Sequence, residues 1–360
     1  KAHTAIKIAP EYSGPVVNVA DASLVVNVCS ALMNKESCAD YHEKLKQEQS
    51  KVRTRFLMQR QEAKYLPFAK AIERSFDPFV DFERVMPSKQ GVFELDFSLD
   101  EIARFIDWSP FFWSWELKGV YPGILKSEKY GEQARELFAD AKDLLGRIIQ
   151  EKRLRPRSLV GIWKAASDVN DVVVYDKKGE VLERFHFLRQ QRLKSEDKAP
   201  YLCLADFIAK AESGYEDYIG GFVVTMGENV EKWASQLEGE GDDYSSILIK
   251  AIGDRMAEAL AELTHKKVRE IFGYGLEENL GIDQLIREQY RGIRPAPGYP
   301  ACPDHTEKEI LWKLLKAEQQ LGVKLTESFA MTPASSVSGF YFSHPGASYF
   351  RVGSIQKDQV

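Results

Sequence analysis

A proline-rich segment at residues 291–308, RGIRPAPGYPACPDHTEK, carries the side chains with the clearest chemical potential in this chain. Prolines at positions 295, 297, 300 and 303 rule out a helix and disfavour a central strand, so we expect an irregular loop. Arg294 offers a planar fork that suits a carboxylate. Gly298 permits close approach to the backbone, and Tyr299 adds a flat face with a polar tip. The segment is therefore a candidate small-molecule site. The open alternative is a rigid connector whose Arg294 caps a neighbouring helix.

Two acidic residues elsewhere in the chain could serve such a site. Asp107 begins the aromatic stretch DWSPFFWSW, where an anion could receive an ammonium group. The alternative is an exposed acid at the edge of a core cluster, since the aromatic residues themselves are expected to be core. Glu258 lies among small residues in RMAEALAE, which would let a ligand approach. The alternative for Glu258 is a solvated helix face that it shares with Arg255 and Glu262.

Several motifs that define common enzyme classes are missing from the sequence. It contains no GxGxxG after a strand, no GxxxxGK(S/T), no HExxH and no GxSxG. Their absence removes most support for dehydrogenase and nucleoside-triphosphate chemistry. Cys302 and His305 could seed a zinc site, but no second pair lies nearby, and the other histidines show no ligand spacing. We therefore expect no metal site.

The regular elements expected around these residues mix helices and strands without strict alternation. Hydrophobic periodicity predicts helices at 131–152, 243–272 and 283–290, and a helix from a Thr306–Glu309 capping box to Gly322. Strands are expected at 158–164, 171–175, 181–187 and 217–226, with a C-terminal hairpin of VSGFYF and YFRVG around SHPGA. The turn DKKGE joins the second and third strands as a hairpin. This order favours an α+β fold, with a central mixed or antiparallel twisted sheet flanked by helices.

The N-terminal part of the chain has a different character. Residues 15–34 predict a short buried strand and then a helix capped by Asp21, which is half of a β/α unit. Residues 37–62 predict a polar helix that opens with Ser37 and Asp40, as in a capping box. Its apolar stripe is thin, which is typical of a helix that lies on a surface or links two bodies.

Bulk composition limits the kinds of partner. The chain has 360 residues, of which 44% are apolar and 29% charged, and a net charge of −5. These values give no case for nucleic acid or an anionic membrane as a partner.

Four scattered cysteines without a CxxC pair indicate reduced thiols in a cytoplasmic protein. No run is long enough to span a membrane and no signal peptide is seen. We expect a fragment of a longer protein, because the sequence starts at Lys1 and stops without a closing element.

Residues 293–308 closely resemble the signature of the activation domain of cobalamin-dependent methionine synthase, whose RxxxGY pattern is matched by Arg294, Gly298 and Tyr299. Further stretches resemble the same family in the same order: FIDWSPFFWSWELKGVYP, LRQQ, DDYSSILIKAIGDRMAEALAE, KLTESFAM and VSGFYFSHP. Residues 1–34 resemble the last strand and helix of a cobalamin-binding module. The resemblance thus implies a cobalamin-module tail at 1–35, a linker helix at 36–65 and a reactivation domain at 66–360.

The resemblance implies that the domain binds S-adenosylmethionine and supports reductive methylation of cob(II)alamin to methylcobalamin. This step reactivates a methyltransferase that moves a methyl group from 5-methyltetrahydrofolate to homocysteine. The implied partners are the cobalamin-binding domain of the same polypeptide and a flavodoxin-like or flavoprotein reductase. The fragment alone is not expected to make methionine. The family's ligand contacts carry over onto Asp107, Glu258, Arg294, Ala296, Gly298, Tyr299, Tyr349 and Phe350.

The carried-over residues suit this ligand chemically. Asp107 suits its ammonium, Arg294 its carboxylate, and the backbone at 296–299 its adenine edges. Tyr349 can place electron density near the sulfonium. No catalytic side chain is expected, because cobalt(I) is the nucleophile and a neutral thioether leaves.

Two other functions remain as alternatives. One is an interaction domain that docks on a cofactor-binding partner and binds no small molecule. The other is a free-standing methyltransferase, which would need a glycine-rich β/α turn that the sequence lacks.

Overall fold

The computed structural model describes residues 2–19, 25–34, 37–62, 64–79, 86–196 and 198–359, and of residues 59–62 the backbone alone. The chain divides into two compact units, Lys1–Leu66 with Arg192–Asp197, and Pro67–Gln191 with Lys198–Val360. All candidate site residues lie in the second unit.

The first unit is helical. It contains η1 (Thr4–Ile8), η2 (Ala9–Glu11), α1 (Val25–Met33) and α2 (Cys38–Glu62). The expected strand at its start is wrong, because residues 15–19 form no strand and are not buried. A side chain, and not a partner strand, satisfies part of their backbone: Gln49 of α2 donates a hydrogen bond to the Val16 carbonyl at 2.7 Å. Asp21, the expected N-cap, lies outside the described residues.

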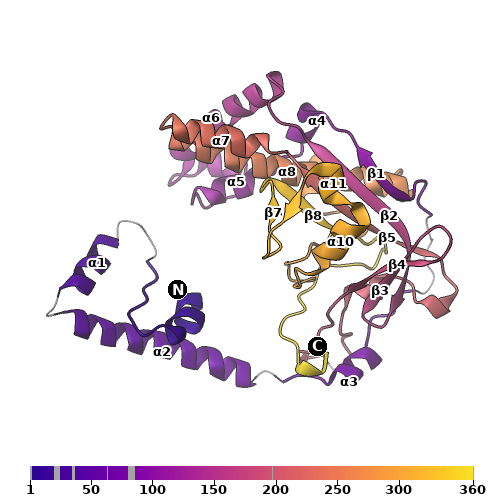
Figure 1. The fold of residues 1–360 in the computed structure, drawn as a ribbon, viewed down its shortest axis with the longest axis horizontal. Coiled ribbons are helices and arrows are strands. Elements are labelled where there is room, and N and C mark those ends of the chain that lie inside the picture. The colour runs from indigo at the N-terminus through magenta and orange to yellow at the C-terminus, as the bar shows by residue number, and fades with distance from the viewer. Residues whose placement is uncertain are drawn as a thin grey trace. The chain divides into compact units, whose positions relative to one another are not determined.

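The second unit is built on an antiparallel sheet, as expected from the sequence (Figure 1). Its strands run in the order β4-β3-β2-β5-β8, and β1 also pairs with β2. They are β1 (Gly91–Leu95), β2 (Arg157–Asp168), β3 (Asp171–Tyr175), β4 (Val181–His186), β5 (Asp217–Thr225) and β8 (Ser336–Tyr341). A separate ribbon pairs β6 (Lys324–Leu325) with β7 (Met331–Thr332). The predicted hairpin at DKKGE is confirmed between β3 and β4.

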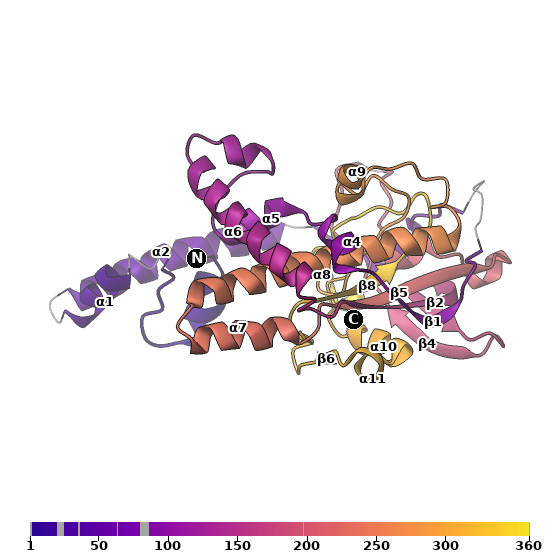
Figure 2. The same ribbon diagram turned by 90° about the horizontal axis from the view of Figure 1, so that it is seen from above.

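Helices cover both faces of the sheet (Figure 2). Side chains of β2 alternate between two cores, with Val160 and Ile162 in one, and Leu159 and Trp163 in the other. The first core includes residues of α4 (Leu99–Ala103), α5 (Trp108–Ser114), α6 (Gly131–Gln150), α7 (Asn229–Gly239) and α8 (Asp243–Phe272). The second includes residues of α10 (Glu307–Leu315) and α11 (Ala317–Leu321). The other helices described in this unit are α3 (Phe68–Glu73), α9 (Ile282–Ile286) and the short 3-10 helices η4 (Gly123–Lys126), η5 (Leu204–Phe207), η6 (Ala211–Ser213) and η7 (Lys357–Gln359). No helix in the described part of the chain combines the length and apolar character needed to cross a bilayer.

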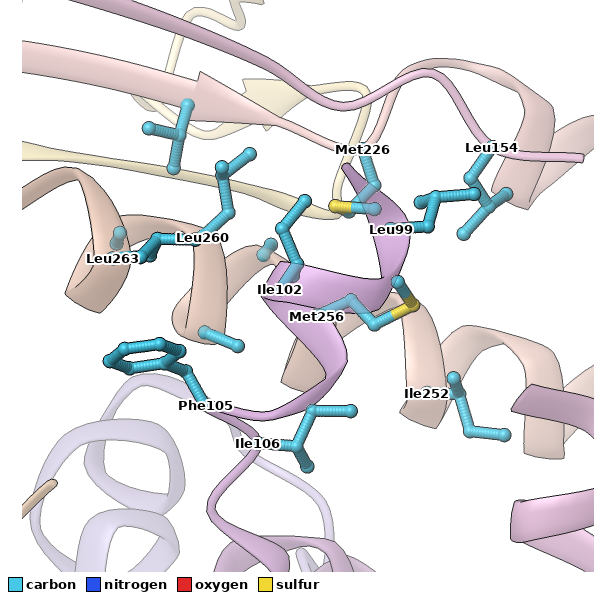
Figure 3. Close-up of a cluster of buried hydrophobic side chains, with 14 of the residues drawn as sticks. Leu99, Ile102, Phe105, Ile106, Leu154, Met226, Ile252, Met256, Leu260 and Leu263 are labelled. Carbon is cyan, nitrogen blue, oxygen red and sulfur yellow. The ribbon is translucent and has the colours of Figure 1, made fainter. Parts of the chain in front are cut away.

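The long helix α8 has two different buried sides. On one side Ile252, Met256 and Leu260 pack against Leu99 and Ile102 in the first core (Figure 3). The other side carries a stripe of ionisable residues spaced by four, three and four positions, Glu258, Glu262, His265 and Arg269. Residues at these spacings share one helix face. Hydrophobic burial therefore fixes α8 and presents the polar stripe to the opposite side.

The predicted C-terminal hairpin is wrong. Its first half is β8, but the second half, residues 349–353, forms no strand. β8 pairs with β5 on one edge, and on its other edge Phe342, just beyond the strand, forms a bridge with Ile293. The proline-rich segment thus takes the place that the hairpin partner would have occupied.

The predicted helix from Thr306 to Gly322 is two helices. Lys316 breaks it with a left-handed backbone, and Gly322 ends the second piece as expected. The Thr306–Glu309 capping box does not form, because the Thr306 hydroxyl donates to the Asp304 carboxylate at 2.8 Å.

The aromatic stretch is largely core as expected: Trp108, Phe111 and Phe112 are buried, whereas Trp113 is 52% exposed. Strand β1 had not been expected.

Glu307, at the start of α10, should make stability depend on pH. Its buried carboxylate accepts a hydrogen bond from the His186 backbone N–H at 3.0 Å. Burial raises the pKa of Glu307 to about 7 from its ordinary 4.5, although the His186 hydrogen bond opposes this shift. The unfolded chain therefore loses this proton first, and stability falls as the pH rises from 4.5 to 7. We expect Glu307→Gln to be more stable than the parent at pH 8 and to lose this advantage near pH 4, by denaturant unfolding. A difference that is constant across this range would contradict the assignment.

Candidate small-molecule site

The proline-rich segment is held as an irregular edge strand beside β8. Ile293 and Phe342 exchange two backbone hydrogen bonds of 3.0 and 3.1 Å, and the Phe340 N–H donates to the Pro295 carbonyl at 2.9 Å. Proline is tolerated here because an edge position does not need its missing N–H. The intervening Arg294 turns its N–H away from β8, and this group donates to the Tyr349 hydroxyl at 3.0 Å. Two segments far apart in sequence thus meet at Arg294.

A tight turn follows the edge strand. The Gly298 N–H donates to the Cys302 carbonyl at 2.7 Å, and the Cys302 N–H donates to the Tyr299 carbonyl at 3.0 Å. Gly298 has φ 97°, a region that favours glycine. A Cβ added at Gly298 would lie 2.1 Å from Cε1 of His305. The glycine of RxxxGY is therefore required both by its backbone angle and by the neighbouring ring.

Gly298→Ala should destabilise the domain by about 1–3 kcal/mol, because it adds backbone strain and displaces His305. Gly322→Ala is a matched control: Gly322 has φ 75°, but a Cβ there meets nothing within 4 Å. We expect chemical denaturation to show the larger loss for Gly298→Ala. Equal losses would mean that His305 moves aside without cost and that only the backbone angle matters.

A cavity of about 420 Å³ opens beside this turn. Its size is that of a typical small-molecule pocket. Its walls come from the proline-rich segment, β8, α8, α10 and the segment at 349–350. Six of the eight residues expected from the sequence line it: Glu258, Arg294, Ala296, Tyr299, Tyr349 and Phe350.

The other two expected residues do not line the cavity. Gly298 shapes the turn beside it. Asp107 is the N-cap of α5, and its Oδ1 accepts a hydrogen bond from the Ser109 N–H at 2.9 Å. This contact gives Asp107 a structural role and leaves its second carboxylate oxygen for another donor.

Arg294 forms a buried ion pair that was not expected from the sequence. Its Nη1 donates to Oε2 of Glu262 at 3.0 Å, and the two side chains are only 13% and 9% exposed. Burial opposes the charge on Arg294, but the Glu262 carboxylate and the nearby tyrosine hydroxyls together outweigh burial, and the pKa of Arg294 is raised. The sequence signal was present: Glu262 follows Glu258 by one helical turn, on the polar stripe of α8.

Lys308 and Glu288 also line the cavity and were missed. Lys308 is buried, and its Nζ donates to the Phe329 carbonyl at 2.8 Å. Burial lowers the pKa of Lys308. With Glu258 and Arg294, the cavity offers two carboxylates and two cations between apolar walls. Such a set of charges suits a zwitterion that carries a flat apolar group.

The protein is thus an α+β domain in which the segment at the sheet edge lines a cavity large enough for one small molecule. The model of the family described as "Vitamin B12 dependent methionine synthase, activation domain" matches residues 98–360. The chain belongs to this family, as the sequence resemblance had indicated. It is also similar to the crystal structure of the MetH reactivation domain bound to AdoHcy. The two are 45% identical with a TM-score of 0.79, over 82% of this chain and 91% of that one.

Proposed function

We propose that this chain binds S-adenosylmethionine in the cavity beside the proline-rich segment. The observation that carries the proposal is that the similar MetH reactivation domain is bound to AdoHcy, which is S-adenosylmethionine without its methyl group. Six residues carried over from the sequence resemblance line one cavity here, which supports the same location. S-adenosylmethionine is a zwitterion with a flat adenine, and the charges of the cavity match it.

The carboxylate of the ligand would bind Arg294. Its Nη1 donates to Glu262, and no hydrogen bond from Nε or Nη2 to another described residue is seen. Two parallel N–H groups of a guanidinium can hold a carboxylate in a fixed plane. The ammonium would bind Glu258, which lines the cavity and has no ion-pair partner in the described ranges. Asp107 does not line the cavity, and its role as a second acceptor stays a prediction.

The adenine would lie against the backbone of the turn. The N–H groups of Gly298 and Tyr299 are used within the turn. The N–H of Ala296, by contrast, has no partner in the part of the chain that is described. The Ala296 N–H and the nearby carbonyls are thus the backbone groups that could pair with adenine edges. Tyr349 and Phe350 would then flank the rest of the ligand.

The role of this binding would be reductive methylation of cobalamin, which restores an inactive methionine synthase. Cobalamin supplies the metal nucleophile, and we expect it to be held mainly by the cobalamin-binding domain of the same polypeptide. This chain's residues would hold the methyl donor and leave its sulfonium methyl accessible. We further propose a flavodoxin-like or flavoprotein reductase as electron donor, with residues 1–35 as a cobalamin-module tail, 36–65 as linker and 66–360 as the activation domain.

Isothermal titration calorimetry of the 360-residue chain tests this proposal. We expect saturable binding of S-adenosylmethionine at one site, and binding of S-adenosylhomocysteine at the same site by competition. Methionine alone is the control, because it lacks the adenine and should bind far more weakly. No binding of either adenosyl ligand would favour the alternative, a domain that only docks on a cofactor-binding partner.

A further inference from the structure

Glu262 lies directly behind the ligand-facing arginine. It belongs to the polar stripe of α8, one turn after Glu258, and it does not line the cavity. Its Oε2 accepts the hydrogen bond from Arg294 Nη1 at 3.0 Å. Its Oε1 is buried and has no hydrogen-bond partner among the described residues. The carboxylate therefore makes one directed contact, and that contact is to the arginine of RxxxGY.

The buried surroundings strengthen the hydrogen bond between Arg294 and Glu262, and no other described residue hydrogen-bonds to this carboxylate. The hydroxyls of Tyr290 and Tyr341 are buried beside the pair, and the ring of His265 stacks on Tyr341 at 4.9 Å. Burial, together with Arg269 and Arg294, lowers the pKa of His265 well below its ordinary value, so His265 stays neutral. A charge-assisted hydrogen bond in such a dry environment is stronger than the same contact in water.

Such a pair is a costly way to stabilise a helix. Burying two charges removes them from water, and apolar residues of similar volume often serve stability as well or better. The other side of α8 shows that this helix packs through apolar residues where only packing is needed. An ion pair adds a defined orientation. Because the guanidinium is planar, a partner that holds Nη1 restricts the orientation of the whole group.

We infer that Glu262 is a positioning residue for the ligand carboxylate. By holding Nη1 of Arg294, it aims Nε and Nη2 into the cavity, and so sets the preference for ligands that carry a carboxylate. Glu262 touches the ligand only through Arg294. This inference rests on the proposed function, because it assumes that the carboxylate of S-adenosylmethionine binds Arg294.

The test compares S-adenosylmethionine with its decarboxylated analogue by calorimetry. The parent chain should bind S-adenosylmethionine about ten- to hundredfold more tightly than the analogue, which cannot use Arg294. Glu262→Gln keeps the side-chain volume and removes the charge. It should weaken S-adenosylmethionine about tenfold and leave the analogue unchanged, so that the preference for the carboxylate collapses. Glu270→Gln is the matched control on the same helix, because Glu270 pairs with Lys266 and Lys267 at the surface, and it should change neither affinity.

A purely structural role for Glu262 would weaken both ligands by the same factor, and that result would overturn the inference. An unchanged preference in Glu262→Gln would overturn it as well. If Glu262→Gln does not fold, Glu262→Asp replaces it: the charge remains, but the shorter side chain draws the fork back, and the preference should again fall. A preference equal to that of the parent in Glu262→Asp would then overturn the inference. Failure of the parent to bind either ligand is a distinct outcome, since it rejects the proposed function itself.

Discussion

Arg294→Ala is expected to weaken S-adenosylmethionine binding about ten- to hundredfold, since a charge-assisted pair contributes about 1.5–3 kcal/mol. The same change also strips the buried Glu262 carboxylate of its partner. Removing one member of a buried pair destabilises a domain by about 3–5 kcal/mol, and both side chains here are less than one-sixth exposed. We therefore expect a lower melting temperature together with the lost affinity, with binding measured well below the melting transition.

A double variant separates the two effects of Arg294. Arg294→Met combined with Glu262→Leu replaces the whole ion pair by apolar side chains of similar size. Such a replacement is often neutral for stability, so the melting temperature should return close to that of the parent. The affinity for S-adenosylmethionine should not return. Recovery of both properties would mean that Arg294 serves only the fold, as in the connector alternative.

Asp206→Ala is expected to destabilise the domain by about 3–5 kcal/mol. Arg189 holds Asp206 through two hydrogen bonds of 2.7 and 2.6 Å, and these side chains are 1% and 5% exposed. Burial disfavours the charge on Arg189, but the Asp206 carboxylate outweighs this effect and raises the pKa of Arg189. Without Asp206 the guanidinium would be left charged in a dry core.

The surface pair of Lys232 and Glu228 is the matched control. These side chains are 64% and 69% exposed, so Glu228→Ala should cost no more than about 0.5 kcal/mol. Urea denaturation of both variants measures the difference. A loss below about 1 kcal/mol for Asp206→Ala would contradict the assignment of Arg189 and Asp206 as a structural pair.

The sequence alone was enough to predict that the proline-rich segment is an irregular loop with a glycine at a tight position. Four prolines exclude a helix, and the glycine at position 298 suits both the left-handed backbone there and the close approach of the His305 ring. The strands from 157 to 225 were also readable, because they consist of apolar runs that end at clear turns. Local chemistry was enough in both cases, since glycine and proline act through their own backbone angles.

Features that depend on distant partners were not readable. The partner of β8 beyond its free edge is the segment around Ile293, not the residues that follow β8 in sequence, so a hairpin was wrongly expected. In the same way, Arg294 meets Glu262 across 32 positions. The sequence alternative placed Glu262 on a solvated face of this helix, whereas the structure buries it against Arg294. The resemblance to a known family supplied the ligand, which no pattern of residues had indicated.

The most direct test of the account is a crystal structure of this chain grown with S-adenosylmethionine. We expect the ligand in the cavity beside residues 294–301, with its carboxylate on Nε and Nη2 of Arg294 and Nη1 still on Glu262. The adenine should face the backbone near Ala296, and the sulfonium should lie near Tyr349. A ligand bound elsewhere, or a ligand in this cavity with its carboxylate away from Arg294, would contradict the account.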